Sequence, residues 1–245
     1  MKAWRTLPRC FADLPELVPG RVSLSRDEAR HLLRVRRVSA GDRVTVLNGQ
    51  GSVGLGLLET EGRELVFVEV DEIFSVPPAA PDLTLCIGAL KQSAWDEVLK
   101  HAVELGVNRI FRVQTERAVS EVKSEKEHRK QQRWRECMTE ACKQSANPWL
   151  PEIRLFRGVE DALQALPPGI LQYRGGLEGN PPALGERLPG KLPSALAVWI
   201  GPEGDFSPAE TRRLEEAGVQ SVQLGERILR AETAALALIA RLRLE

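Results

Sequence analysis

Cysteine and histidine are scarce in this 245-residue sequence, and neither occurs in a pattern that binds metal. The cysteines are Cys10, Cys86, Cys137 and Cys142, and the histidines are His31, His101 and His128. No two cysteines form a C-x-x-C pair, and no histidine stands at zinc-ligand spacing from a cysteine pair. We therefore expect reduced thiols that are buried or tolerated, and no metal site.

Long apolar runs are also absent. No stretch of the sequence approaches the ~20 consecutive apolar residues that a membrane-spanning helix needs. Residues 1–9 lack the apolar stretch of a secretory signal. Hydrophobic residues nevertheless make up 42% of the chain, enough for an ordinary buried core. We expect a cytoplasmic protein that does not contact a membrane.

An excess of charge of either sign is missing as well, because the formal net charge is zero. The distribution is uneven, however. Residues 1–43 carry ten basic and five acidic residues, a balance of +5, whereas residues 44–75 carry one arginine and six acids, a balance of −5. Such a sign change is typical of a basic face that attracts phosphate groups. A solvated charged surface explains the same counts equally well.

The first 75 residues have the pattern of a small β-barrel-like module with one helix. Ser25 is predicted to cap a helix that runs to about Arg36. Strands are expected at 43–47, 53–58 and 65–70, with a tight turn at Asn48-Gly49. The proline-rich segment 76–81 suits neither a helix nor a central strand. It predicts a linker between a domain at 1–75 and a second domain at 82–245.

Beyond the linker, predicted strands and helices alternate. The expected strands are 83–90, 107–113, 169–173, 196–200 and 219–224, and the expected helices are 93–105, 125–145, 207–217 and 231–244. Strands separated by helices pair in parallel, and the helices then cover both faces of the sheet. The second domain is therefore predicted to be α/β with a mostly parallel sheet.

The segment 199–210, WIGPEGDFSPAE, has a composition that local structure does not fully explain. Ser207 and Glu210 form a capping box for the following helix, with Pro208 at its first position. Gly201 and Gly204 leave the backbone accessible to a ligand at the carboxyl end of a strand. A tight strand-to-helix turn accounts for the cap but not for the internal Glu203, so we favour a binding loop.

The segment 224–235, LGERILRAETAA, also leaves a strand and precedes a helix. Arg230 and Glu232 stand between the apolar pair Ile228-Leu229 and the buried-looking run 234–236. Either charged residue alone would usually lie on the surface. Their placement predicts that they face a ligand.

Together these two segments resemble the GPEGG-F-S and LG-x-RILR-T-E-T-A motifs of the bacterial 16S rRNA (uracil-N3) methyltransferases, a SPOUT family. Five shorter matches follow the family's order: 31–37 with Gly41-Asp42, 104–107, 133–134, 140–145 and 150–153. The chain departs from the family pattern at three positions. It has Asp205 where the second glycine is usual, Ala231 where a threonine is usual, and Asn147 where arginine is common.

The resemblance implies an N-terminal PUA-like domain and a C-terminal SPOUT trefoil knot, in which the last segment is threaded through an earlier loop. It also implies a homodimer and the cofactor S-adenosylmethionine, without a metal. The residues it assigns to the cofactor are Gly201, Pro202, Glu203, Gly204, Leu224, Gly225, Ile228, Leu229, Ala231 and Thr233. The implied reaction is methylation of uracil N3 at uridine 1498 of 16S rRNA during maturation of the small ribosomal subunit, and DNA is not a partner.

Roles can then be assigned to individual residues. Arg230 is predicted to stabilise the developing uracil anion, and Glu232 to orient that arginine or to help remove the N3 proton. A purely structural Arg230–Glu232 pair is the alternative. The residues predicted to hold rRNA through its phosphates are Arg5, Arg34, Arg36 and Arg37. Two other functions stay open, namely a SPOUT enzyme acting on tRNA or another rRNA position, and a non-catalytic RNA-binding assembly factor.

Overall fold

The computed structural model describes residues 3–62, 65–118, 124–176 and 179–244, and the chain divides into two compact units. The first unit combines residues 1–78 with 138–150, and the second combines 79–137 with 151–245. The first of the three points at which the chain passes from one unit to the other lies inside the proposed linker 76–81. Residues 138–150 belong with the first unit, although they lie inside the range predicted for the second domain.

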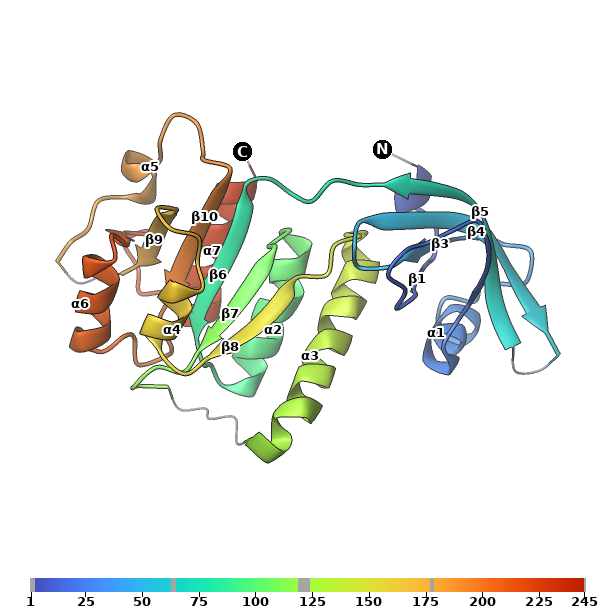
Figure 1. The fold of residues 1–245 in the computed structure, drawn as a ribbon, viewed down its shortest axis with the longest axis horizontal. Coiled ribbons are helices and arrows are strands. Elements are labelled where there is room, and N and C mark those ends of the chain that lie inside the picture. Colours follow the sequence, from blue (N-terminus) through green and yellow to red (C-terminus); the bar gives the residue numbers. More distant parts are fainter. Residues whose placement is uncertain (1–2, 63–64, 119–123, 177–178, 245) are drawn as a thin grey trace. The chain divides into compact units, whose positions relative to one another are not determined.

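The first unit contains a five-stranded sheet in the order β1-β3-β4-β5-β2 (Figure 1). Its strands are β1 (Arg9–Phe11), β2 (Gly20–Ser23), β3 (Arg43–Leu47), β4 (Ser52–Glu61) and β5 (Leu65–Ser75). β1 pairs with β3 in parallel, and the other pairs are antiparallel. The apolar patterns predicted β3, β4 and β5. β1 and β2 span three and four residues, too few for a periodic pattern to be visible.

One helical segment covers this sheet. Ser25 caps α1 (Arg26–Arg30), as predicted, because its hydroxyl accepts a hydrogen bond of 3.2 Å from the backbone N–H of Glu28. The helix continues into the π-helical turn η2 (His31–Val35). Ala29 and Leu32 on its inner side belong to the same core as the sheet residues Val44, Val46 and Val68. The short turn η1 (Ala3–Arg5) precedes β1.

A buried ion pair holds residues 138–150 within the first unit. The ammonium of Lys143 is bonded to the carboxylate of Glu28, and the two side chains are only 5% and 13% exposed. The other oxygen of that carboxylate accepts a hydrogen bond of 2.9 Å from the backbone N–H of Phe11. Lys143 also pairs with Glu140 at 2.7 Å. Burial alone would lower the pKa of Lys143, but hydrogen bonds and charge from Glu140 and Glu28 raise it above its ordinary value.

The second unit contains a six-stranded sheet in the order β11-β9-β10-β6-β7-β8, and all of its neighbouring strands pair in parallel. The strands are β6 (Asp82–Gly88), β7 (Arg109–Val113), β8 (Glu152–Phe156), β9 (Leu171–Gly175), β10 (Ala195–Ile200) and β11 (Gln220–Val222). The helices are α2 (Gln92–Glu104), α4 (Val159–Gln164), α5 (Leu184–Arg187), α6 (Pro208–Glu216) and α7 (Ala231–Arg243). The helix α3 (Ser124–Ser145) begins in this unit, and its residues from 138 onward belong to the first unit. The predicted parallel α/β sheet is confirmed.

Helices cover both faces of this sheet (Figure 1). α4 and α6 pack on one face, where Phe111 and Trp199 form a core with Val159 and Leu214. α7 packs against β6, β9 and β10 and against α2 on the other face. Because both faces are covered, the strands are apolar almost throughout, as in Ala195–Ile200, where only the first residue is partly exposed.

The segment that follows β11 runs alongside the connection between β9 and β10. Gln223 donates a backbone hydrogen bond of 2.9 Å to the carbonyl of Pro182, and its own carbonyl accepts one of 3.2 Å from Leu184. Leu224 then lies against Gly175, the last residue of β9, and the chain enters α7, which packs against β9 and β10. The α/β trefoil knot implied by the sequence resemblance is the fold of this unit.

Candidate active site

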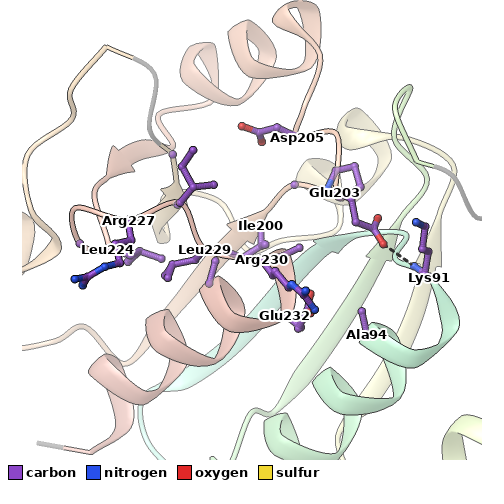
Figure 2. Close-up of a pocket in the computed structure, with 18 of the residues that line it drawn as sticks. Lys91, Ala94, Ile200, Glu203, Asp205, Leu224, Arg227, Leu229, Arg230 and Glu232 are labelled. Atoms are coloured by element: carbon purple, nitrogen blue, oxygen red, sulfur yellow. Dashed lines mark hydrogen bonds and ion pairs between the residues drawn. The ribbon is translucent and has the colours of Figure 1, made fainter.

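A cavity of about 590 Å³ opens at the carboxyl ends of four strands of the second unit (Figure 2). Its walls come from the segments that follow β6, β9, β10 and β11. These segments are 91–94, 175–176, 200–205 and 224–234. Residues of both sequence motifs, 199–210 and 224–235, line this cavity, so the two loops meet at one site. The volume lies within the roughly 300–1,000 Å³ of small-molecule sites.

Most of the predicted cofactor residues line this cavity. They are Gly201, Pro202, Glu203, Leu224, Gly225, Ile228, Leu229 and Ala231. Gly204 and Thr233 are not among the lining residues, and Thr233 is exposed on α7. The backbone N–H of Asp205 donates a hydrogen bond of 2.8 Å to the carbonyl of Pro202 and closes a turn. Gly204 lies within this turn and does not line the cavity. A side chain at Gly204 would meet Cβ of Arg117 at 3.2 Å, and Arg117 also donates to the carbonyl of Gly204.

Several lining residues were not predicted. They are Lys91, Ser93, Ala94, Gly175, Gly176, Ile200, Asp205, Arg227 and Ala234. Lys91 and Gly175 lie at or just beyond the carboxyl ends of β6 and β9, where ligands of parallel sheets bind. That rule, applied to every predicted strand, is the signal that would have found them. The glycine-rich motifs alone point only to the ends of β10 and β11.

The structure explains the internal glutamate of the first motif. Glu203 Oε1 accepts a hydrogen bond of 3.1 Å from the backbone N–H of Lys91, the N-cap residue of α2 (Figure 2). The side chain of Lys91 provides no cap of its own. A carboxylate at this end of a helix satisfies a free backbone donor and interacts favourably with the helix dipole. Glu203 therefore fixes the β10–α6 loop to the start of α2.

Arg230 and Glu232 are brought together but do not form a tight pair. The distance from Arg230 Nη1 to Glu232 Oε1 is 4.0 Å, too long for a hydrogen bond. The side chain of Arg230 is 86% exposed and that of Glu232 is 21% exposed. Arg230 is the N-cap residue of α7, so its backbone is fixed while its guanidinium remains at the rim of the cavity. This geometry gives little support to a purely structural pair.

The first unit carries an exposed basic segment around α1 and η2. Part of the charge difference between residues 1–43 and residues 44–75 is neutralised within the sheet. Arg43 pairs with Asp71 at 2.8 Å, and Arg21 pairs with Glu61 at 3.0 Å. The arginines at 26–37 have no ion-pair partner among the residues that the structure describes, and all are exposed. They are Arg26, Arg30, Arg34, Arg36 and Arg37. Arg5, which was grouped with them, is exposed and lies over the ring of Trp4.

Within residues 3–62, 65–118, 124–176 and 179–244, no group of three or more His, Cys, Asp or Glu side chains is arranged to hold a metal ion. In the same part of the chain, no helix combines the length and apolar character needed to cross a membrane. Cys10, Cys86 and Cys142 are buried and Cys137 is partly buried. Burial raises the pKa of the Cys10 and Cys86 thiols, which makes them poor nucleophiles.

Comparisons with known proteins agree with this geometry. Residues 78–243 match the family described as RNA methyltransferase domain, and residues 24–71 match the RNA methyltransferase PUA domain. The ribosomal RNA small subunit methyltransferase E of Synechocystis is 29% identical over 93% of this chain and 74% of its own length. That of Bacillus subtilis is 26% identical over 87% of this chain and 86% of its own.

Solved structures give the same answer. A Legionella pneumophila protein described as a methyltransferase in complex with S-adenosylmethionine has a TM-score of 0.87 and 26% identity, with 97% of both chains covered. A ribosomal RNA small subunit methyltransferase E from Neisseria gonorrhoeae, bound to S-adenosylmethionine, has a TM-score of 0.86 and 28% identity, again with 97% of both chains covered. As its motifs predicted, the chain belongs to the family of bacterial RNA methyltransferases that includes the ribosomal RNA small subunit methyltransferases E.

Proposed function

We propose that this protein transfers a methyl group from S-adenosylmethionine to uracil N3 of one uridine of 16S rRNA, uridine 1498 by family resemblance. The observation that carries the proposal is the cavity at the ends of β6, β9, β10 and β11, with Arg230 at its rim. The names of its relatives, which refer to small-subunit rRNA and to S-adenosylmethionine, support the same substrate and cofactor.

The residues of the cavity suit this cofactor. Ile200, Leu224 and Leu229 supply an apolar slot for an adenine ring, and the backbone at Gly201 and Gly225 lies within the wall. Backbone N–H groups can donate to the ring nitrogens of adenine, and backbone carbonyls can accept from its exocyclic amino group. Apolar walls with few polar groups are usual for such ligands. No metal is required for this chemistry.

The chain's own contribution is positioning and charge stabilisation. When bound, S-adenosylmethionine supplies an electrophilic methyl group. Methylation at N3 requires loss of the N3 proton, and negative charge then develops on the uracil ring. Arg230 stabilises this charge, because α7 fixes the backbone of this N-cap residue and its guanidinium reaches the rim of the cavity. Glu232, 4.0 Å from Arg230, orients the guanidinium or accepts the proton. A Glu232→Gln variant separates these two roles. If Glu232 accepts the N3 proton, the methylation rate depends on pH in the wild-type protein and this dependence disappears in the variant; if Glu232 only orients Arg230, the pH dependence is the same in both.

Filling part of the cavity should weaken cofactor binding without damage to the fold. Ala94 lines the cavity from the first turn of α2 (Figure 2). We expect Ala94→Phe to weaken S-adenosylmethionine binding by about 10- to 100-fold, the effect of forcing a large side chain into occupied space. Isothermal titration calorimetry measures the change. Ala209→Phe is the matched control, since Ala209 is exposed in the first turn of α6 and outside the cavity. Equal losses in both variants would contradict the assignment.

We propose that the basic segment of the first unit holds rRNA through its phosphates. Arg36→Glu combined with Arg37→Glu should lower rRNA affinity at least about tenfold and reduce the slope of log K against log salt by about two. Filter binding at several salt concentrations gives both numbers. The control is Arg157→Glu with Arg212→Glu, two exposed arginines of the second unit with the same change in net charge. An unchanged slope in the first variant places the RNA footprint elsewhere.

The proposed function itself is tested by methyl transfer in vitro. Purified protein and S-adenosylmethionine are incubated with unmodified 16S rRNA, with assembled small subunits and with tRNA, and digested nucleosides are analysed by mass spectrometry. We expect 3-methyluridine in a small-subunit substrate and none in tRNA. Methylation of tRNA alone supports the alternative SPOUT enzyme, and RNA binding without cofactor binding supports an assembly factor.

The setting follows from the same resemblance. We propose that the protein works in the cytoplasm, as a homodimer, during maturation of the small ribosomal subunit. Sedimentation equilibrium of the purified protein tests the dimer, because a monomer at micromolar concentration is incompatible with it.

A further inference from the structure

One acidic residue of the cavity has no role in the account above. Asp205 lines the cavity and lies between Gly204 and Phe206 on the β10–α6 loop. In the family motif this position is usually a second glycine. The backbone of Asp205 has a φ of 56°, in the left-handed region that favours glycine. A carboxylate has therefore replaced a hydrogen atom at a position where the backbone itself prefers glycine.

Local hydrogen bonds hold Asp205 in this conformation. Its backbone N–H donates to the carbonyl of Pro202 at 2.8 Å and closes the turn. Its Oδ1 accepts a hydrogen bond of 2.8 Å from the backbone N–H of Phe206. Aspartate and asparagine tolerate the left-handed region better than other side chains because they form such local bonds. The Asp205 side chain is therefore fixed, and its direction is determined by the loop.

The carboxylate lies over a wall of the cavity. A side chain at Gly201 would overlap with Asp205 Oδ1 and approach Asp205 Cα to 2.9 Å, so the two residues are packed together. Gly201 is itself a lining residue. Figure 2 shows Glu203 directed toward Lys91 and Asp205 directed away from it. The two carboxylates of this loop thus face different regions.

Among the residues that the structure describes, Asp205 also lacks a counterion, and it differs from the cavity's other two acids, Glu203 and Glu232, in its surroundings. Glu203 accepts from the backbone N–H of Lys91, and Glu232 lies 4.0 Å from Arg230. Within the described part of the chain, Asp205 has no cationic partner within ion-pair distance, and its Oδ2 has no hydrogen-bond partner. Arg117, which follows β7, donates to the backbone carbonyls of Gly204 and Phe206 on either side of Asp205. A fixed carboxylate with a free oxygen at a cavity wall attracts a cationic group of a ligand.

We propose that Asp205 is a specificity-determining residue that binds a positively charged group of the methyl donor. This inference rests on the proposed function, because it takes S-adenosylmethionine as the ligand. That cofactor carries two cationic groups, the α-ammonium and the sulfonium. The demethylated product, S-adenosylhomocysteine, retains the ammonium but has a neutral thioether. 5′-Methylthioadenosine has neither charge and shares the adenosine part, so the three ligands separate charge recognition from adenosine recognition.

The test uses two variants of the full chain. Asp205→Asn keeps the shape of the side chain, an oxygen to accept from Phe206 N–H and tolerance of a positive φ. Asp205→Gly restores the residue usual in the family and relaxes the backbone. In both variants we expect S-adenosylmethionine affinity to fall about tenfold, the scale of one hydrogen bond to a charged group. Affinity for 5′-methylthioadenosine should stay within twofold of wild type.

S-Adenosylhomocysteine identifies which charge is recognised. If its affinity falls with that of S-adenosylmethionine, Asp205 binds the ammonium; if it is unchanged, Asp205 binds the sulfonium and favours donor over product. The inference is overturned if both variants bind S-adenosylmethionine like wild type, or if all three ligands weaken equally. Wild-type protein that binds none of the ligands would instead refute the proposed cofactor, which is a distinguishable result.

Discussion

Replacing Arg230 with alanine should lower the single-turnover methylation rate by about 10²- to 10³-fold, the scale of losing one donor that stabilises the charge of the transition state. Cofactor affinity and melting temperature should stay close to wild type. The reason is structural: the guanidinium is 86% exposed, and its distance of 4.0 Å to Glu232 leaves no tight contact to lose. Single-turnover kinetics at saturating cofactor, calorimetry and thermal melting on one preparation give all three quantities.

Two further variants make this result specific. Arg230→Lys should recover only part of the rate, because a flexible ammonium does not reproduce the planar guanidinium. Arg241→Ala, an exposed arginine near the other end of α7, should leave the rate unchanged. If Arg230→Ala instead loses stability and cofactor affinity together while its rate at saturation stays near normal, Arg230 is a structural residue and leaves the catalytic set.

Replacing Lys143 with methionine should reduce the free energy of unfolding of the first unit by about 3–5 kcal/mol, the usual cost of removing one partner of a buried ion pair. Methionine keeps most of the side-chain volume, so the loss reports the charge and not a cavity. Among the residues that the structure describes, the carboxylate of Glu28, 13% exposed, would then keep the N–H of Phe11 as its one remaining partner. Urea unfolding with a constant m-value measures the change.

The controls separate the buried contact from the exposed one. Glu140→Gln removes the other partner of Lys143, which is 60% exposed, and should cost less than about 1 kcal/mol. Glu28→Gln combined with Lys143→Met should recover much of the loss, because no uncompensated charge remains buried. Since the pKa of Lys143 is raised, its contribution is fully present at neutral pH and is lost only as pH rises through that elevated pKa. A single-variant cost equal to that of Glu140→Gln would show that the buried pair contributes little.

Patterns within single segments predicted much of the fold. The Ser25 cap, the parallel α/β order and the capping box at Ser207, where Glu210 and Ser207 each accept from the other's backbone, follow from local chemistry. β8 and α4 were not predicted, although Glu152–Phe156 alternates charged with apolar residues as a half-buried strand does. The two elements span only five and six residues, which makes their patterns easy to miss. The threading of the last segment depends on contacts such as Gln223 with Pro182, which no local pattern encodes. Only the family resemblance implied it.

The residues of the candidate site were likewise predicted only in part. Motif residues such as Gly201 and Leu229 were found from the sequence because glycine and apolar residues stand out between a strand and a helix. Ala94 and Gly175 were missed because each is unremarkable in its own segment and becomes a site residue only when parallel strands align their carboxyl ends. The direction of Gly204, toward Arg117 and away from the cavity, depends on the turn that Asp205 closes. Sequence spacing alone does not determine it.

The central claim is that this protein methylates N3 of one uridine in 16S rRNA, and rRNA from a strain lacking its gene tests it most directly. Mass spectrometry of nuclease fragments should show one uridine of 16S rRNA lighter by a single methyl group in the deletion strain. The methyl group should return when the strain expresses the wild-type protein and not when it expresses the Arg230→Ala variant. An rRNA methylation pattern identical with and without the gene would contradict the account.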